Sequence, residues 1–176
     1  MDKQDTARQF AVGILVNNHF GVLNRVAGLY AKRTYNIDSL AVGETEDPRF
    51  SRMTIVSTGD DYMREQVVKQ LRKLHDVKEV VLFEDNSTVG VEHALVKMKS
   101  ASEYSAGISD LVERFGGKIK DFGPDYVVIE ITGDHGKVEA FLERVGRDAI
   151  IEAVRSGLIS MSRDLGQVLS VAEYED

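Results

Sequence analysis

The chain has 176 residues, of which 43% are hydrophobic and 29% charged, with a formal net charge of -7 and no cysteine. This length fits one medium domain or two small ones, and the lack of cysteine excludes disulfides, thiolate metal sites and a cysteine nucleophile. The negative charge argues against a general nucleic-acid binder, and no apolar run is long enough for a membrane span. Together with a polar N-terminus that lacks a secretory signal, this predicts a cytoplasmic protein.

The first half of the chain alternates strand-like and helix-like patterns. A continuous apolar run predicts a buried strand, and the helical spacing of Val22, Val26 and Leu29 predicts the helix after it. Asp60 and Asp61 open a second helix, because carboxylates there accept from free backbone N–H groups. The predicted order is strand, helix, strand, strand, helix, strand, at residues 10–16, 22–33, 36–44, 51–57, 60–74 and 77–83.

The second half repeats the same order without close sequence identity. Gly116-Gly117 predicts a helix end, and Asp134 predicts the start of the next helix. The closing strand is divided between two short segments. The predicted elements are a strand at 91–99, a helix at 103–115, strands at 118–122 and 126–131, a helix around 138–145, and strand segments at 149–154 and 158–161.

These patterns predict an α+β protein with two tandem ferredoxin-like βαββαβ units. We place the first at residues 9–84, a linker at 85–90, the second unit at 91–164 and a polar tail at 165–176. Such a unit has both helices on one face of an antiparallel sheet, which leaves the other face bare. A unit of roughly 75 residues buries only about 60–65% of its unfolded surface. We therefore expect association between units or chains, in a homodimer or a larger assembly.

The chain shows no catalytic constellation. Its four histidines, His19, His75, His93 and His135, form no close ligand pair, so no metal site is predicted. The segment Gly133–Lys137 resembles the end of a phosphate loop but lacks its spacing and its Ser or Thr. No nucleophile-elbow GxSxG occurs.

The segment NNHFGVL, residues 17–23, lies between a predicted strand and a predicted helix. A glycine there allows close approach to the backbone, and the first-turn N–H groups suit a carboxylate. The carbonyl oxygens of Asn17 and Asn18 suit an ammonium group, so the segment fits a free amino acid. The alternative is purely structural, with Asn18 capping the helix and Gly21 relieving a tight turn.

The segment NNHFGVLNRVAGLYAKRTYNIDSLAVGETEDPRFSRMTIVSTGDD closely resembles the regulatory small subunit of acetohydroxyacid synthase, also called acetolactate synthase. Further matching segments are EQVVKQLRKLHDV, VEHALVKMK, RFGGKIKDFGPDYVVIEITG, KVEAFLERV and EAVRSGLISMSR. The resemblance extends from about Gln9 to Arg163, and such long ordered motifs are specific.

The resemblance implies that residues 9–84 form an ACT domain, which binds amino acids, and that 91–164 form the family's C-terminal domain. It implies a homodimer whose ACT sheets join side by side, with valine, or leucine or isoleucine, bound between them. The effector residues carried over from the family are Asn18, His19, Phe20, Gly21, Val22 and Leu23 of one chain, with Asn36 and Ile37 of the other. Many ACT domains have a proline before the glycine, where this chain has Phe20.

The resemblance also implies a partner, the catalytic large subunit of the synthase. That partner carries thiamine diphosphate, magnesium and FAD, whereas this chain has no active site, cofactor or metal of its own. The expected function is to raise the activity of the partner and to confer feedback inhibition in branched-chain amino-acid synthesis. The alternative is a free-standing amino-acid sensor that acts on another protein or an operator.

Overall fold

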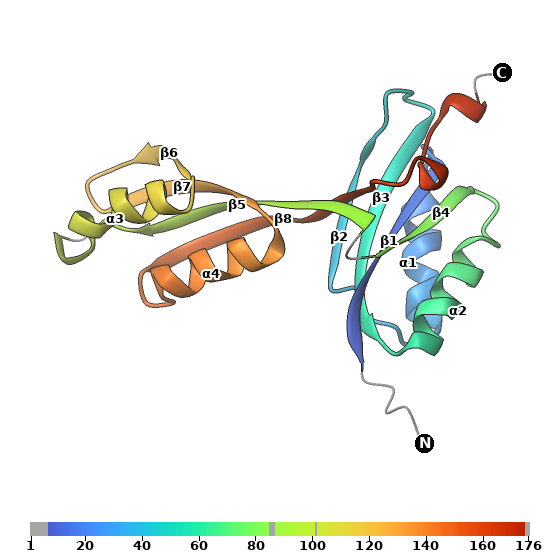
Figure 1. Cartoon of the computed structure of the whole chain (residues 1–176), viewed down its shortest axis with the longest axis horizontal. Coiled ribbons are helices and arrows are strands. Elements are labelled where there is room, and N and C mark those ends of the chain that lie inside the picture. The colour runs from blue at the N-terminus through green and yellow to red at the C-terminus, as the bar shows by residue number, and fades with distance from the viewer. Residues whose placement is uncertain (1–6, 85–86, 101, 175–176) are drawn as a thin grey trace. The chain divides into compact units, whose positions relative to one another are not determined.

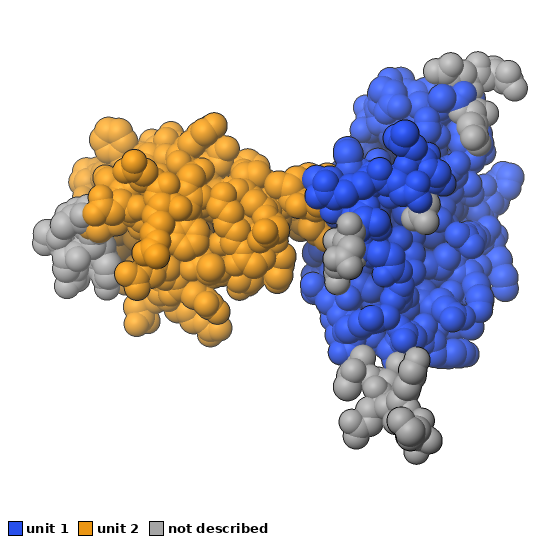
Figure 2. Space-filling model, in the orientation of Figure 1, with its two compact units in different colours: residues 1–89, 160–176 blue, residues 90–159 orange. Residues whose placement is uncertain are grey.

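The computed structural model describes residues 7–84, 87–100 and 102–174, and its chain divides into two compact units (Figure 2). Unit 1 comprises residues 1–89 together with 160–176, and unit 2 comprises 90–159. Each unit contains one four-stranded sheet (Figure 1). The predicted α+β architecture of two tandem ferredoxin-like units is confirmed.

Unit 1 has the predicted order of elements, in a sheet of order β2-β3-β1-β4. Its central strand β1 pairs antiparallel with both β3 and β4. The elements are β1 (Arg8–Asn17), α1 (Val22–Lys32), β2 (Ser39–Glu44), β3 (Phe50–Gly59), α2 (Asp61–Leu71) and β4 (Val77–Phe83).

The core of unit 1 lies between the sheet and its two helices. Alternate residues of β1 face the helices, namely Phe10, Val12, Ile14 and Val16. The apolar stripes of the helices meet them through Val22, Val26 and Leu29 of α1 and Val67 and Leu71 of α2. The residues between them on β1 are buried as well, which explains why β1 reads as a continuous apolar run rather than an alternating one.

Unit 2 repeats the topology in a sheet of order β6-β7-β5-β8. Its elements are β5 (Thr88–Lys99), α3 (Ser102–Arg114), β6 (Lys118–Phe122), β7 (Tyr126–Gly133), α4 (His135–Val145) and β8 (Ile150–Ser162). Gly116 takes φ +60° after α3, and Asp134 caps α4 by accepting from Lys137 N–H, as predicted. The two predicted closing segments form the single strand β8, in which Gly157 has φ +72°.

Residues 165–174 do not form the separate polar tail that we predicted, because they pack on the sheet of unit 1. They include two short 3-10 helices, η2 (Leu165–Gln167) and η3 (Ala172–Tyr174). Between these helices Leu169 and Val171 are buried. We call residues 160–174 the returning segment.

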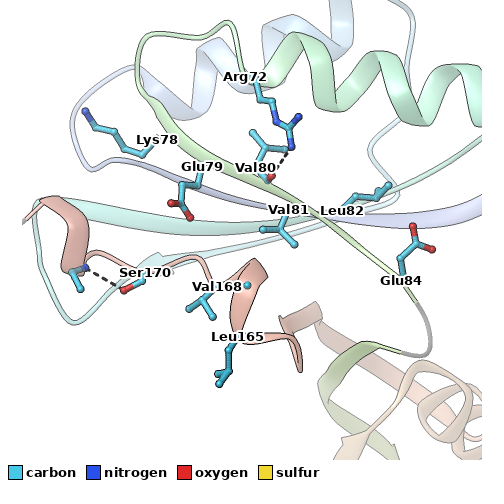
Figure 3. Close-up of a pocket in the computed structure, with 12 residues that line it drawn as sticks. Arg72, Lys78, Glu79, Val80, Val81, Leu82, Glu84, Leu165, Val168 and Ser170 are labelled. Atoms are coloured by element: carbon cyan, nitrogen blue, oxygen red, sulfur yellow. Dashed lines mark hydrogen bonds between the residues drawn. The ribbon is translucent and has the colours of Figure 1, made fainter.

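The returning segment lies on the face of the sheet opposite α1 and α2 (Figure 3). A Cβ atom added at Gly13 would lie 2.8 Å from Leu169 Cδ1 and 2.5 Å from the Phe83 ring. Only glycine therefore fits at position 13, beneath the returning segment. The returning segment thus covers the face that we expected another unit or chain to cover. The predicted linker also differs, since β5 begins at Thr88, and residues 85–86 lie outside the described residues.

In the part of the chain that the structure describes, no helix is both long enough and apolar enough to cross a membrane.

Candidate functional site

The loop between β1 and α1, together with the first two residues of α1, holds six of the eight predicted effector residues. It lies at the end of the sheet, where two other loops anchor it through backbone hydrogen bonds. Asn17 N–H donates to the carbonyl oxygen of Asp76 at 2.9 Å, and Asn18 N–H donates to that of Arg49 at 2.7 Å. We call residues 18–23 the effector loop.

The first turn of α1 lacks a side-chain cap. Its N-cap residue is Gly21 in the left-handed conformation, at φ +88°, which glycine adopts without strain. By contrast, Asp60 and Asp134 cap α2 and α4 with their carboxylates. The N–H groups of Leu23 and Asn24 donate to no backbone acceptor among the described residues. This end of α1 therefore presents free donors and the positive end of the helix dipole.

Asn18 does not cap α1, so the structural alternative for this residue is wrong. Its Nδ2 donates instead to Glu44 Oε1 at 3.0 Å and to the Pro48 carbonyl oxygen at 2.9 Å. These two bonds fix the orientation of the amide. Its Oδ1 accepts no hydrogen bond from the described residues, so it is available to a donor from outside.

The apolar residues of the effector loop differ in their exposure to solvent. Val22 is buried in the core of unit 1. Phe20 is 97% exposed and Leu23 is 42% exposed, although both are large hydrophobic residues. The loop therefore presents an apolar surface beside its free backbone donors.

The buried carboxylate of Asp76, in the turn between α2 and β4, contacts one residue within the effector loop and one residue after it. Its Oδ1 lies 3.0 Å from His19 Nε2, and its Oδ2 lies 2.6 Å from Arg25 Nε. Burial alone raises the pKa of the Asp76 carboxyl, but the Arg25 guanidinium and then His19 outweigh it and hold that pKa below its usual range. The second nitrogen of His19, Nδ1, lies 3.2 Å from the Phe20 carbonyl oxygen.

The other two predicted residues, Asn36 and Ile37, lie elsewhere in the unit. Asn17 is opposite Phe50 on β3, whereas Asp38 N–H donates to the carbonyl oxygen of Val56. At a strand rise of about 3.3 Å per residue, Phe50 and Val56 are about 20 Å apart on β3, so Asn18 and Asn36 lie at opposite ends of the sheet. The structure therefore brings residues 18–23 together but does not bring Asn36 and Ile37 to them within one chain.

The local environments of Asn36 and Ile37 differ. Asn36 is exposed, and its Nδ2 donates to Asp38 Oδ1 at 2.6 Å, which leaves its Oδ1 without a donor among the described residues. Thr58 Oγ1 donates to the other carboxylate oxygen of Asp38 at 2.7 Å. Ile37 is partly buried and packs against the core. Both residues precede β2, which is an edge strand of the sheet.

Two larger hollows in the described chain contain none of the predicted effector residues. A groove of about 940 Å³ lies between β4 and the returning segment, with Lys78, Val81, Leu165 and Val168 among its lining residues (Figure 3). A second hollow of about 480 Å³ lies in unit 2 beside α3 and α4. Among the described residues no group of His, Asp and Glu side chains is arranged to hold a metal ion.

The sequence reasoning missed Arg25 and Asp76 as residues of the site. The helical pattern placed Arg25 on the solvent-exposed face of its helix, and Asp76 lay in a turn far along the chain. Both occur in segments that carry the family resemblance, LNRV within NNHFGVLNRV and LHDV within EQVVKQLRKLHDV. Their contact depends on how α2 and β4 pack against α1, which no local pattern reports.

Comparison with protein families gives two adjacent matches. Residues 12–79 match a family described as the AHAS small subunit-like ACT domain, and residues 91–164 match the small subunit of acetolactate synthase. The acetolactate synthase small subunit of Haemophilus influenzae is 39% identical over 159 residues, which is 90% of this chain and 98% of that protein. That of Aquifex aeolicus is 40% identical over 175 residues, which is 99% of this chain and 89% of that protein.

A solved structure is similar over most of the chain. It is the crystal structure of the acetolactate synthase small subunit from Thermotoga maritima, with 40% sequence identity and a TM-score of 0.83. The match covers 89% of this chain and 98% of that one.

Proposed function

The chain belongs to the acetolactate synthase small-subunit family. From this membership we propose that it is a regulatory subunit that binds the catalytic large subunit. In this role it raises the activity of the large subunit and makes it sensitive to branched-chain amino acids, valine above all. It performs no catalysis itself. Thiamine diphosphate, magnesium and FAD belong to the large subunit in this proposal.

One observation supports the amino-acid site most directly, namely the uncapped N-terminus of α1. Gly21 has no side chain to fill the first turn, and the N–H groups of Leu23 and Asn24 have no backbone acceptor among the described residues. A carboxylate bound there accepts hydrogen bonds from these groups and lies at the positive end of the helix. The valine carboxylate is the group that we assign to this position.

The two asparagines supply acceptors for the ammonium group of valine. Asn18 and Asn36 each use Nδ2 within the chain, through Glu44 and Asp38 respectively, so that each amide has a free Oδ1. Because they lie at opposite ends of the sheet in one chain, one bound valine meets both only if Asn36 comes from a second chain. This separation supports a site formed between two copies.

The edges of the unit 1 sheet favour a dimer through β2. At the β4 edge a groove lies between β4 and the returning segment, and Arg72 donates to the Val80 carbonyl oxygen at 3.3 Å. The other edge is β2, where Val42 is 52% exposed. An edge strand of this kind pairs readily with another chain, which is the side-by-side dimer that the family resemblance implies. Phe20 and Leu23 then lie on the exposed apolar surface of the effector loop.

Feedback inhibition requires that valine bind more tightly to one state of the assembly than to another. Coupling of about 1–3 kcal/mol between the two sites is typical of such regulation and changes affinity about 5- to 150-fold. Valine bound across two chains changes the free energy of their contact, and the large subunit responds to that contact.

The test is reconstitution with the large subunit. Co-purification should recover a thiamine diphosphate enzyme whose activity rises when this chain is added and falls when valine is added. The variant Gly21→Asp should keep the activation and lose the inhibition, because its carboxylate occupies the position of the ligand carboxylate. A side chain has space here, since the nearest atom to a Cβ added at Gly21 would be Arg25 Nη1 at 3.7 Å. The φ of +88° strains any residue with a Cβ, but aspartate is one of the few such residues that enter the left-handed region.

Two outcomes would contradict the proposal. If no enzyme is activated and valine binds nonetheless, the chain is a sensor that acts on another target. If Gly21→Asp remains inhibited by valine as the unaltered protein is, the effector site lies elsewhere. Titration of valine into the isolated protein separates these cases.

A further inference from the structure

We propose that Asp76 is a positioning residue of the effector site: it holds His19 and Arg25 so that the effector loop is preformed and the free edge of the Arg25 guanidinium faces the ligand carboxylate at Gly21. This inference rests on the proposed function, because it concerns the same site. It adds two residues, Arg25 and Asp76, to the eight that the family resemblance supplied.

Asp76 contacts the chain before, within and after the effector loop. Its carbonyl oxygen accepts from Asn17 N–H at 2.9 Å. Its two carboxylate oxygens lie 3.0 Å from His19 Nε2 and 2.6 Å from Arg25 Nε. The Asp76 side chain is only 9% exposed, whereas those of His19 and Arg25 are about half exposed. The fixed, buried member of the cluster is therefore the carboxylate, and the two exposed members depend on it.

Arg25 keeps donors available for a ligand. A guanidinium has five N–H donors, and Asp76 takes the one on Nε. The terminal nitrogens meet no acceptor among the described residues, and Nη1 lies 3.7 Å from the position that a Cβ atom at Gly21 would take. The free edge of this cation thus lies next to the uncapped first turn of α1. A carboxylate bound there meets a charge as well as backbone donors.

Holding the loop in advance raises affinity without any contact to the ligand. A loop that is already ordered loses less conformational entropy when it binds, and a fixed guanidinium requires no rearrangement. Asp76→Asn removes the negative charge and one of the two acceptor oxygens, and it places an N–H group against His19 or Arg25. We therefore expect weaker binding from a change that does not touch valine.

The experiment measures binding of two probes, valine and valinamide, to the full-length protein by calorimetry. Valinamide keeps the ammonium and isopropyl groups but has no carboxylate. Arg25→Gln should weaken valine about 10- to 100-fold, as expected for loss of a charged hydrogen bond, and should change valinamide less than about 3-fold. Asp76→Asn should weaken valine about 5- to 30-fold.

The double variant tests whether Asp76 acts through Arg25. If it does, adding Asp76→Asn to Arg25→Gln should weaken valine by less than about a further 3-fold, because coupled changes are not additive. Matched controls are Asp61→Asn, which alters an exposed aspartate paired with Arg8, and Lys32→Gln, which removes a cation at the other end of α1. Both controls should bind valine as the unaltered protein does.

The outcomes separate this inference from the proposed function. If the unaltered protein does not bind valine, both are overturned. If it binds valine and Asp76→Asn binds equally well, or if the effects of the two substitutions multiply in full, only the positioning role is overturned. Arg25→Gln alters a half-exposed side chain, so it tests the inference even if Asp76→Asn does not fold.

Discussion

Units 1 and 2 have one topology but differ on the sheet face opposite their helices. On the central strand of unit 1, that face carries Ala11, Gly13 and Leu15, all buried. The returning segment lies on that face through Leu169, whose Cδ1 lies close to Gly13. Glycine therefore occurs at position 13, where another segment of the chain packs closely.

The same face of unit 2 is exposed and carries polar and apolar side chains together. Its central strand β5 carries His93, Leu95 and Lys97 there, with His93 and Leu95 exposed. Lys97 Nζ lies 4.3 Å from the centre of the Tyr126 ring, and Glu130 forms an ion pair with Lys120 at 2.9 Å. The same fold thus has two ways to complete a sheet with helices on one side only. One is to bury the free face under the chain itself, and the other is to leave that face exposed, with charged and polar side chains among the apolar ones.

The largest expected effect on stability comes from truncating a leucine on this face of the sheet, compared between the two units. Leu169→Ala should lower the stability of unit 1 by about 2–4 kcal/mol, because it leaves a cavity between the returning segment and the sheet. Leu95→Ala is the matched control, and it should lower the stability of unit 2 by less than about 1 kcal/mol because that side chain is exposed. Native-state hydrogen exchange measures each unit separately. Equal losses in the two units would contradict the distinction between a covered and an exposed face.

A smaller effect is expected at the charged cluster of unit 2. Glu92 is buried, and its two carboxylate oxygens each accept from Arg155 at 2.7 Å. These hydrogen bonds hold the pKa of the Glu92 carboxyl below its ordinary value, against the opposing effect of burial. Glu92→Gln should lower the stability of unit 2 by about 1–3 kcal/mol at neutral pH and leave unit 1 unchanged.

Acid unfolding gives the sign of the Glu92 contribution. A depressed pKa means that this contribution is complete above the unfolded value, near about 4.3, and is lost as the pH falls through the lower folded value. The gap between the unaltered protein and Glu92→Gln should therefore close as the pH falls below about 4. Urea unfolding followed by circular dichroism measures it, and a gap that is constant with pH would exclude the ion pair as its cause.

The smallest effect on stability is expected at Phe20. Since its side chain is 97% exposed, Phe20→Ser should change the stability of unit 1 by less than about 0.5 kcal/mol. If the effector loop lies at the dimer interface, the same change should raise the dimer dissociation constant about 10-fold. Sedimentation measures that constant, with Leu165→Ser as the control because Leu165 is 91% exposed in the returning segment. An unchanged constant would remove Phe20 from the interface.

The sequence by itself determined the order of the elements and the repeat of the unit. Strand alternation, helical spacing and the turns at Gly116 and Asp134 are local signals, because each depends on residues within a few positions of one another. The sequence also predicted the difference between the central strands β1 and β5, since FAVGILV is apolar throughout whereas VEHALVKMK alternates. The family followed from long ordered motifs.

Only the tertiary structure decided what covers the free face of unit 1 and what holds the effector loop. The returning segment reads as a polar tail, because its apolar residues, which include Leu169 and Val171, are interspersed with polar ones and follow no regular period. Asn18 reads as a helix cap, yet its amide bonds to a distant hairpin, and Asp76 reaches Arg25 only through the packing of α2 and β4. These contacts join residues far apart in the chain, so they depend on strand register and helix packing, which local patterns do not encode.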